Sequence, residues 1–147
     1  MVQELKNGII ITPLRIISDE RGKILHALKK SESTFSSFGE AYFSTVEYGC
    51  FKGWKRHKEM VLNLVVPSGA IKFYVVDERD FLFTKSIILS IENYSRLTIP
   101  PGVWLGFEGI EKGLNMLLNI ASIQHEPAES ENREPGFYSH LFPELSV

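Results

Sequence analysis

The side chains best suited to chemistry lie in a short charged run that leads directly into an apolar strand. Gly53 and Trp54 are followed by Lys55–Lys58, in which all four side chains carry or can carry positive charge. The stretch Val61–Val66 is then apolar apart from one asparagine, and a Pro-Ser-Gly turn closes it. Polar groups on a stiff strand are what a functional site requires. A charge run of this kind is also typical of a solvated strand end.

His57 and Lys55 lie two positions apart, so on an extended strand both side chains point to the same face of the sheet. Histidine is the natural general base near neutral pH. An ammonium group stabilises the negative charge that develops on a carbonyl oxygen when the neighbouring carbon loses a proton. We therefore predict His57 as the base and Lys55 as its electrostatic partner, with Arg56 and Lys58 on the opposite face. A lone histidine in a charged segment can equally be a surface residue.

Composition limits the class of protein. The 147 residues fit one domain spanning 1–147, and 44% hydrophobic with 23% charged residues is ordinary for a soluble globular chain. The net charge of −2 argues against a nucleic-acid binder. Cys50 is the only cysteine, which excludes an internal disulfide and a cysteine-based zinc site. The N-terminal residues lack the apolar core of a signal peptide, and no apolar run is long enough to cross a membrane, so we expect a cytoplasmic protein.

Short strands with turns between them account for almost the whole chain, and no apolar period near 3.6 residues persists. We expect an exposed loop at 29–39, an irregular or short helical tail over 125–136, and apolar residues at 137–142 that fold back onto the body. This pattern predicts an all-β barrel or sandwich. The expected strands are 9–17 (interrupted by Pro13), 23–28, 41–51, 61–66, 71–76, 81–91, 95–99, 103–107 and 115–123.

Several short motifs resemble the cupin superfamily. In its sugar-nucleotide branch, an Arg-Gly-aromatic-His-x-His-Lys segment runs into a strand that ends in Ser-Gly. The chain is similar to that branch, namely the dTDP-4-dehydrorhamnose 3,5-epimerases and the WxcM-like dTDP-4-keto-6-deoxyhexose 3,4-ketoisomerases. The matching residues are Lys52, Gly53, Trp54, His57 and Lys58, then Ser68-Gly69, Leu97–Trp104, Leu117–Ser122 and the turn Asp19–Gly22.

The resemblance implies a cupin jelly-roll β-barrel (a double-stranded β-helix) and a cofactor-independent epimerase or isomerase. Its substrate would be a nucleotide-linked, dTDP-type 4-keto-6-deoxysugar that loses its C3 proton, in a pathway making surface polysaccharide. The resembling enzymes are homodimers whose N-terminal strands cross to the partner, which the apolar stretch Gly8–Ile17 would suit. Three positions depart from the pattern. Lys55 stands where these enzymes place a histidine, Leu117 or Leu118 where the epimerases place a tyrosine, and Leu105 where metal-binding cupins place a late histidine. We therefore predict no metal.

Six further residues are predicted to bind the substrate. Arg21 would hold the diphosphate, because a guanidinium group fits phosphate oxygens. The two tryptophans would cover the sugar or stack on the base, and the two asparagines would line the pocket together with a tyrosine of strand 41–51. Each also has a structural reading: Arg21 paired with a neighbouring acid, tryptophans that close the barrel, asparagines satisfied by nearby backbone. The five residues besides Arg21 are Trp54, Trp104, Asn63, Asn119 and Tyr42.

Two other functions remain open. The chain could be a non-catalytic cupin that binds a nucleotide sugar or another anion, with Lys55 marking the loss of catalysis. Alternatively, Lys55 itself could act as the base in a different sugar-processing reaction, if burial favours its neutral form.

Overall fold

Antiparallel strands make up most of the computed structural model, which describes residues 1–147. The prediction of an all-β chain is thus confirmed. Short 3-10 helices occur only in the C-terminal segment. The strands are β1 (Gln3–Lys6), β2 (Ile9–Pro13), β3 (Ile16–Asp19), β4 (Gly22–Leu25), β5 (Glu40–Thr45), β6 (Phe51–His57), β7 (Leu62–Ser68), β8 (Ala70–Asp77), β9 (Phe83–Ser90), β10 (Ser95–Ile99), β11 (Val103–Gly109), β12 (Met116–Ala121) and β13 (Ser130–Asn132).

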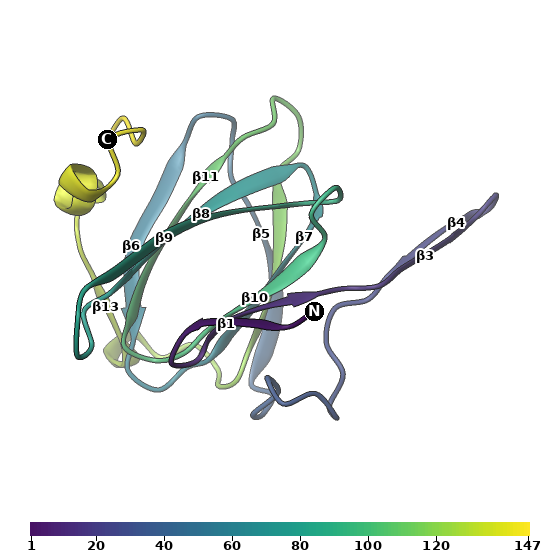
Figure 1. The fold of residues 1–147 in the computed structure, drawn as a ribbon, viewed down its shortest axis with the longest axis horizontal. Coiled ribbons are helices and arrows are strands. Elements are labelled where there is room, and N and C mark those ends of the chain that lie inside the picture. Colours follow the sequence, from purple (N-terminus) through teal and green to yellow (C-terminus); the bar gives the residue numbers. More distant parts are fainter.

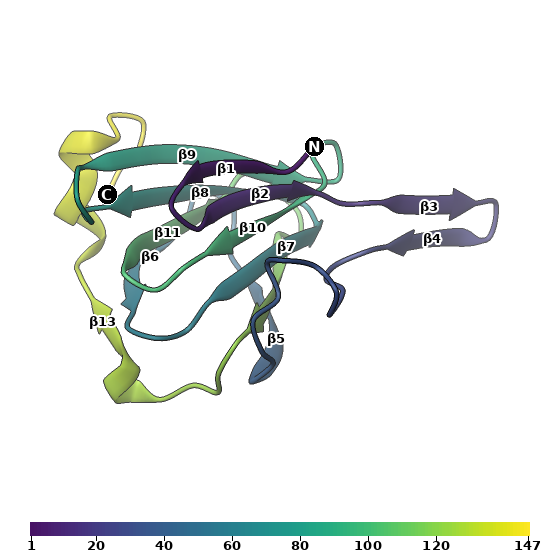
Figure 2. The same ribbon diagram turned by 60° about the horizontal axis from the view of Figure 1, so that its bottom comes forward.

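Two sheets face each other to form the barrel (Figures 1 and 2). One has the order β1-β2-β10-β7-β12-β5, and the other β13-β6-β11-β8-β9. Apolar residues from both inner faces meet between them, such as Leu64 and Leu117 from the first sheet and Phe73 and Leu105 from the second. Alternation of inward and outward residues along each strand produces this core. The predicted jelly-roll barrel is confirmed.

Turn residues explain where the strands differ from the expected ranges. The predicted strand 9–17 divides at Pro13 into β2 and β3, because proline cannot donate a ladder hydrogen bond. The predicted strand 41–51 is too long, since β5 ends at Thr45 and a turn follows in which Gly49 has a φ of +73°. The charged run belongs to a strand of its own, β6, that was not predicted as one.

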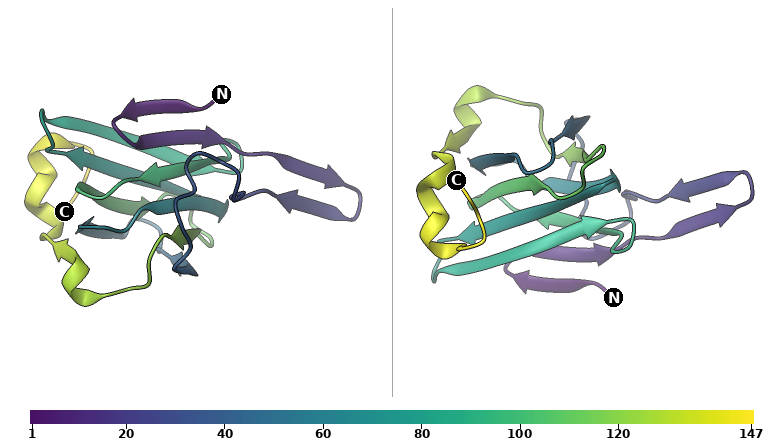
Figure 3. Two further views of the ribbon diagram at one scale, coloured as in Figure 1. Left: turned by 90° about the horizontal axis from the view of Figure 1, so that it is seen from below. Right: turned by 90° about the horizontal axis from the view of Figure 1, so that it is seen from above.

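The β3–β4 hairpin extends away from the barrel as an arm (Figure 3). Its two strands pair only with each other, with Ile17 opposite Ile24. Both isoleucines are exposed. An isolated two-stranded hairpin has little stability of its own.

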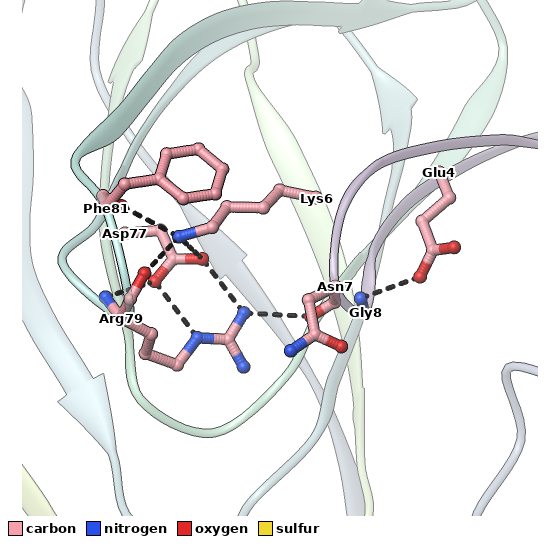
Figure 4. A network of polar contacts seen from close by, with 7 residues as sticks. All are labelled: Glu4, Lys6, Asn7, Gly8, Asp77, Arg79 and Phe81. Atoms are coloured by element: carbon pink, nitrogen blue, oxygen red, sulfur yellow. Dashed lines mark hydrogen bonds and ion pairs between the residues drawn. The ribbon is translucent and has the colours of Figure 1, made fainter.

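A buried ion network fastens the β1–β2 hairpin to the end of β8 (Figure 4). The carboxylate of Asp77 is completely buried and lies 3.2 Å from the Lys6 ammonium and 2.9 Å from the Arg79 guanidinium. Arg79 also donates to the carbonyl of Asn7, at 2.8 Å. Burial acts to raise the pKa of Asp77, but the hydrogen bonds from Arg79 and Lys6 outweigh it and lower the pKa. The network therefore holds the first hairpin against the barrel.

The C-terminal segment runs as a strap along the outside of the β6 sheet (Figure 2). It contains the 3-10 helices η1 (Pro127–Glu129) and η2 (Pro135–Leu141), with β13 between them paired to β6. The predicted irregular or helical tail is confirmed, apart from β13. None of the helices reaches the length and apolar character that a membrane-spanning helix needs.

Aromatic packing attaches the strap to the sheet, as the apolar residues at 137–142 predicted. Tyr138 and Phe142 are buried in a cluster with Trp54 and Tyr74, and the Phe142 and Trp54 rings stack at 6.0 Å. The indole of Trp54 also donates to the carbonyl of Pro135, at 3.0 Å. Phe137 is the exception, since it remains half exposed.

Candidate active site

A cavity of about 300 Å³ opens between the two sheets. Leucines from β7, β11 and β12 form its apolar wall, and Phe107 adds to it. The polar lining residues include two lysines and one histidine, and none of the fourteen lining residues is acidic. The cavity is thus apolar on one side and positively charged on another. The four leucines are Leu62, Leu64, Leu105 and Leu117.

The positive wall is β6, from which Lys52, Lys55 and His57 line the cavity. Lys55 and His57 share this face, as the alternation along an extended strand predicted. Arg56 points the other way, as expected, and pairs with Glu131 at 2.9 Å on the outside of the sheet. Gly53 lets β6 lie close to β11, because a Cβ atom built there would be only 2.7 Å from Cα of Gly106.

The imidazole of His57 is held by a carboxylate. Its Nδ1 atom lies 2.7 Å from Oε1 of Glu129, and both side chains are nearly buried. The other carboxylate oxygen of Glu129 accepts hydrogen bonds from the backbone N–H groups of Glu59 and Met60, at 2.8 and 2.9 Å. Three donors therefore fix the carboxylate that fixes the ring.

These contacts determine which nitrogen of His57 carries the proton. Burial acts to raise the pKa of Glu129, but the hydrogen bonds from His57, Glu59 and Met60 outweigh it and lower the pKa to about 2. An ionised carboxylate can only accept, so Nδ1 of His57 donates to it. In the neutral ring Nε2 then has the free lone pair on the edge away from Glu129, as a general base requires.

Opposite the positive wall, β5 and β12 supply neutral polar groups. Tyr42, Ser44 and Asn119 line the cavity, and the Asn119 side-chain amide donates to the Tyr42 hydroxyl at 3.1 Å. Tyr42 and Asn119 were among the predicted binding residues, and the structure places both beside the cavity. Their hydrogen bond leaves the Tyr42 proton available to a ligand.

Two predicted pocket residues lie outside the cavity, which corrects the expectation that they would line it. Asn63 faces away from it and is buried, donating to the carbonyl of Thr34 at 3.2 Å and accepting from the hydroxyl of Thr98 at 2.6 Å. Trp104 lies on the outer face of β11, where Arg56 and Arg133 cover its ring. Asn63 is therefore a buried polar residue satisfied by its neighbours, and Trp104 packs in the aromatic cluster outside the barrel.

The other two predicted binding residues differ in their distance from the cavity: Trp54 lies at its edge and Arg21 lies far from it. Trp54 borders the cavity, but its ring belongs to the aromatic cluster beneath the strap. Arg21 lies at the tip of the projecting hairpin, where its guanidinium pairs with Asp19 at 2.8 Å and is 85% exposed. The turn prediction for Arg21 was right, and within one chain the residue does not reach the cavity.

Two residues of the strap that belong to the site were not predicted from the sequence. Glu129 follows His57 by 72 positions, and Asn132, which pairs in register with Lys55, also lines the cavity. Both lie in an acidic tail without a recognisable spacing. No group of three or more His, Cys, Asp or Glu side chains gathers in the chain to hold a metal ion.

The fold is that of sugar-nucleotide epimerases and ketoisomerases. The dTDP-4-dehydrorhamnose 3,5-epimerase from Sulfolobus tokodaii superposes with a TM-score of 0.79 over 90% of this chain and 80% of that chain, at 23% identity. A point mutant of the 3,4-ketoisomerase QdtA from Thermoanaerobacterium thermosaccharolyticum, in complex with TDP-4-keto-6-deoxyglucose, superposes with a TM-score of 0.74 over 96% of each chain, at 20% identity. At these identities the likeness concerns the fold, and it confirms the cupin-like jelly roll.

Sequence comparison then gives the family. The model of the WxcM-like, C-terminal family (FdtA) matches residues 7–139, and the chain belongs to that family. A dTDP sugar isomerase from Desulfovibrio desulfuricans G20 is 33% identical, with a TM-score of 0.81 over 93% of this chain and 87% of that chain. The search of curated proteins finds no match. The suspected family relationship is confirmed.

Proposed function

We propose that the chain is a cofactor-independent epimerase or ketoisomerase that removes the C3 proton of a dTDP-linked 4-keto-6-deoxysugar. The isomerase class of sugar-nucleotide enzymes follows from the family and from the Desulfovibrio relative, a dTDP sugar isomerase. The observation that carries the finer proposal is the His57–Glu129 pair at the cavity wall. A hydrogen beside a ketone is acidic enough for an oriented imidazole to remove.

The charge distribution of the cavity supports the same reaction. When the C3 proton leaves, negative charge develops on the C4 oxygen, and positively charged groups near that oxygen lower the barrier. Lys55 and Lys52 supply positive charge on the wall that also holds His57, and no acidic side chain opposes it. The leucine wall offers an apolar surface for the methyl group of a 6-deoxysugar.

Arg21 can act on the substrate only if the hairpin arm reaches another subunit. The arm projects from the barrel with Ile17 and Ile24 exposed, so association of two chains would bury apolar surface on both. We therefore propose a homodimer in which Arg21 contacts the diphosphate bound by the partner. Cytoplasmic location and a role in surface polysaccharide synthesis stay predictions from the sequence.

The test is exchange of hydrogen with solvent. The protein is incubated in D₂O with dTDP-4-keto-6-deoxyglucose, and deuterium at C3 and C5 is followed by NMR. We expect deuterium at C3 and its loss in His57→Asn. Glu131→Gln is the matched control, because Glu131 pairs with Arg56 outside the cavity. Tight binding without exchange would instead support the non-catalytic cupin, for which Lys55, and Leu117 or Leu118, speak as departures from the histidine and tyrosine that the family resemblance implies.

A further inference from the structure

The amine of Lys55 is the one cationic group on the cavity wall that no other group of the chain engages. The neighbouring Lys52 donates to the carbonyl of Thr45 at 2.7 Å, and His57 is held by Glu129. Lys55 makes neither a hydrogen bond nor an ion pair, although its side chain lines the cavity. No carboxylate occurs among the lining residues to pair with it.

An amine in such surroundings is suited to nucleophilic chemistry. Lysine amines form Schiff bases with ketones, and a nearby cation or an apolar setting activates them. The cation is present, because Lys52 lines the same wall, while Lys55 itself is solvent-exposed at the edge of a cavity lined by four leucines.

We propose that Lys55 acts as a covalent catalyst and forms an iminium ion with the C4 ketone of the bound sugar. This inference rests on the proposed function and replaces an electrostatic role of Lys55 with a covalent one. Lys55 would then be bonded to C4, while His57 removes the proton from the adjacent carbon, C3.

The step balances without any further reactant. The neutral Lys55 amine adds to the C4 ketone, and with one proton from solvent the adduct loses one water molecule and becomes a protonated iminium ion. Nε2 of His57 then takes the C3 hydrogen as a proton. The C3–H electron pair forms the C3–C4 double bond, and the C=N pair moves to nitrogen, which gives a neutral enamine. Reprotonation of C3 from the opposite face restores the iminium ion, and addition of water releases the C3-epimerised ketone and the lysine; a shift of the ketone to C3 would leave the amine bonded to C4, so this step serves epimerisation. The iminium nitrogen accepts the electrons that a ketone oxygen would otherwise hold as an enolate.

Register within the sheet supports the division of roles. Lys55 lies opposite Leu105 on β11 and Asn132 on β13, and His57 lies opposite Ser130. Lys55 and His57 therefore lie two positions apart along one face of β6, and β13 pairs with the backbone of both. Adjacent carbons of one sugar ring fit two side chains so arranged.

Two measurements on the full-length protein test the proposal. In the first, dTDP-4-keto-6-deoxyglucose is incubated with the protein in H₂¹⁸O, because imine formation exchanges the C4 oxygen with solvent and simple enolisation does not. In the second, sodium borohydride is added, and the trapped secondary amine is located by peptide mass mapping. We expect enzyme-dependent ¹⁸O incorporation at C4 and a sugar-nucleotide adduct on Lys55.

Variants separate the covalent role from the electrostatic one. Lys55→Arg keeps the charge but cannot form the imine, so we expect no adduct, no ¹⁸O exchange above background, and C3 deuterium exchange lowered by at least about 100-fold. Ethylamine should restore part of the exchange to Lys55→Ala. Lys58→Arg is the matched control, since Lys58 lies in the same charged run but does not line the cavity.

The outcomes distinguish this proposal from the proposed function. Deuterium exchange at C3 without an adduct or ¹⁸O incorporation would overturn the covalent role and leave the isomerase intact. An adduct that maps to Lys52 would overturn the assignment to Lys55. Absence of exchange at C3 together with absence of an adduct would overturn both proposals.

Discussion

Nδ1 of His57 lies 2.7 Å from a carboxylate oxygen of Glu129, which connects the cavity wall to the C-terminal strap. Replacing Glu129 by glutamine removes the charge and permits the other orientation of the ring. We expect C3 deuterium exchange to fall by about 10²–10⁴-fold, mainly in kcat, because an unoriented base loses most of its effect. A rise in KM with unchanged kcat would show that Glu129 acts on binding alone. Glu131→Gln serves as the control here too.

Glu129 also makes stability depend on pH. Its folded-state pKa of about 2 lies below the ordinary value of 4.5, so its stabilisation is fully present above about pH 5 and is lost as the pH falls toward 2. The shift corresponds to on the order of 3 kcal/mol. We expect the free energy of unfolding to decline over this range in the wild type and less steeply in Glu129→Gln, measured by urea titration at several pH values. Equal slopes would contradict this assignment.

The Asp77 network predicts a large loss of stability when its charge is removed. Asp77→Asn leaves Lys6 and Arg79 without their common carboxylate, and breaking a buried ion pair costs about 3–5 kcal/mol. The double variant Lys6→Met with Asp77→Asn should recover part of that loss in urea unfolding. Glu144→Gln is the control, because its bridge to Lys72 is 42% exposed on the Glu144 side and should contribute about 1 kcal/mol or less.

Docking of the strap depends on its buried aromatic side chains. Phe142→Ala removes a ring that stacks on Trp54 and contacts Tyr74, so we expect a loss of about 3 kcal/mol and faster tryptic cleavage after Arg133. Activity should fall with it, since Glu129 and Asn132 belong to the same segment. Phe38→Ala is the control: Phe38 is 64% exposed, and its removal should change stability by about 0.5 kcal/mol or less.

Arg21 should matter for binding but not for folding. Its guanidinium is 85% exposed and its pair with Asp19 lies at the surface, so Arg21→Ala should leave the thermal midpoint unchanged. If the arm reaches a partner subunit, the affinity for dTDP measured by calorimetry should fall about tenfold or more. An unchanged affinity in a protein that sedimentation shows to be dimeric would contradict the proposed contact.

The sequence predicted local features well. Alternation along an extended strand was enough to put Lys55 and His57 on one face, and the glycine and proline turns delimited most strands. For Asn63, in contrast, the alternation pattern did not identify which face of the strand borders the cavity. Asn63 alternates with Leu62 and Leu64 on β7, but both faces of that strand are buried, one by the cavity side of the barrel and the other by the segment that includes Thr34. Polarity within an apolar strand therefore could not tell which face was the pocket.

Long-range contacts account for the rest. Glu129 lies in an acidic tail whose composition predicts a solvent-exposed segment. Only the pairing of β13 with β6 brings its carboxylate to His57. Trp104 was expected at the pocket because of its size and the motif around it. Leu105 takes the inward position instead, which leaves Trp104 on the outer face beneath Arg56 and Arg133. Neither outcome follows from spacing within one segment.

The pairing of β13 with β6 also has a consequence during protein synthesis. The 72 positions between His57 and Glu129 take the ribosome several seconds at about 5–20 residues per second. Until Glu129 has been synthesised, its carboxylate cannot hold the His57 ring in the orientation seen in the folded chain. Catalytic competence should therefore arise in a single late event, when the carboxylate reaches the barrel, and not gradually as the strands assemble.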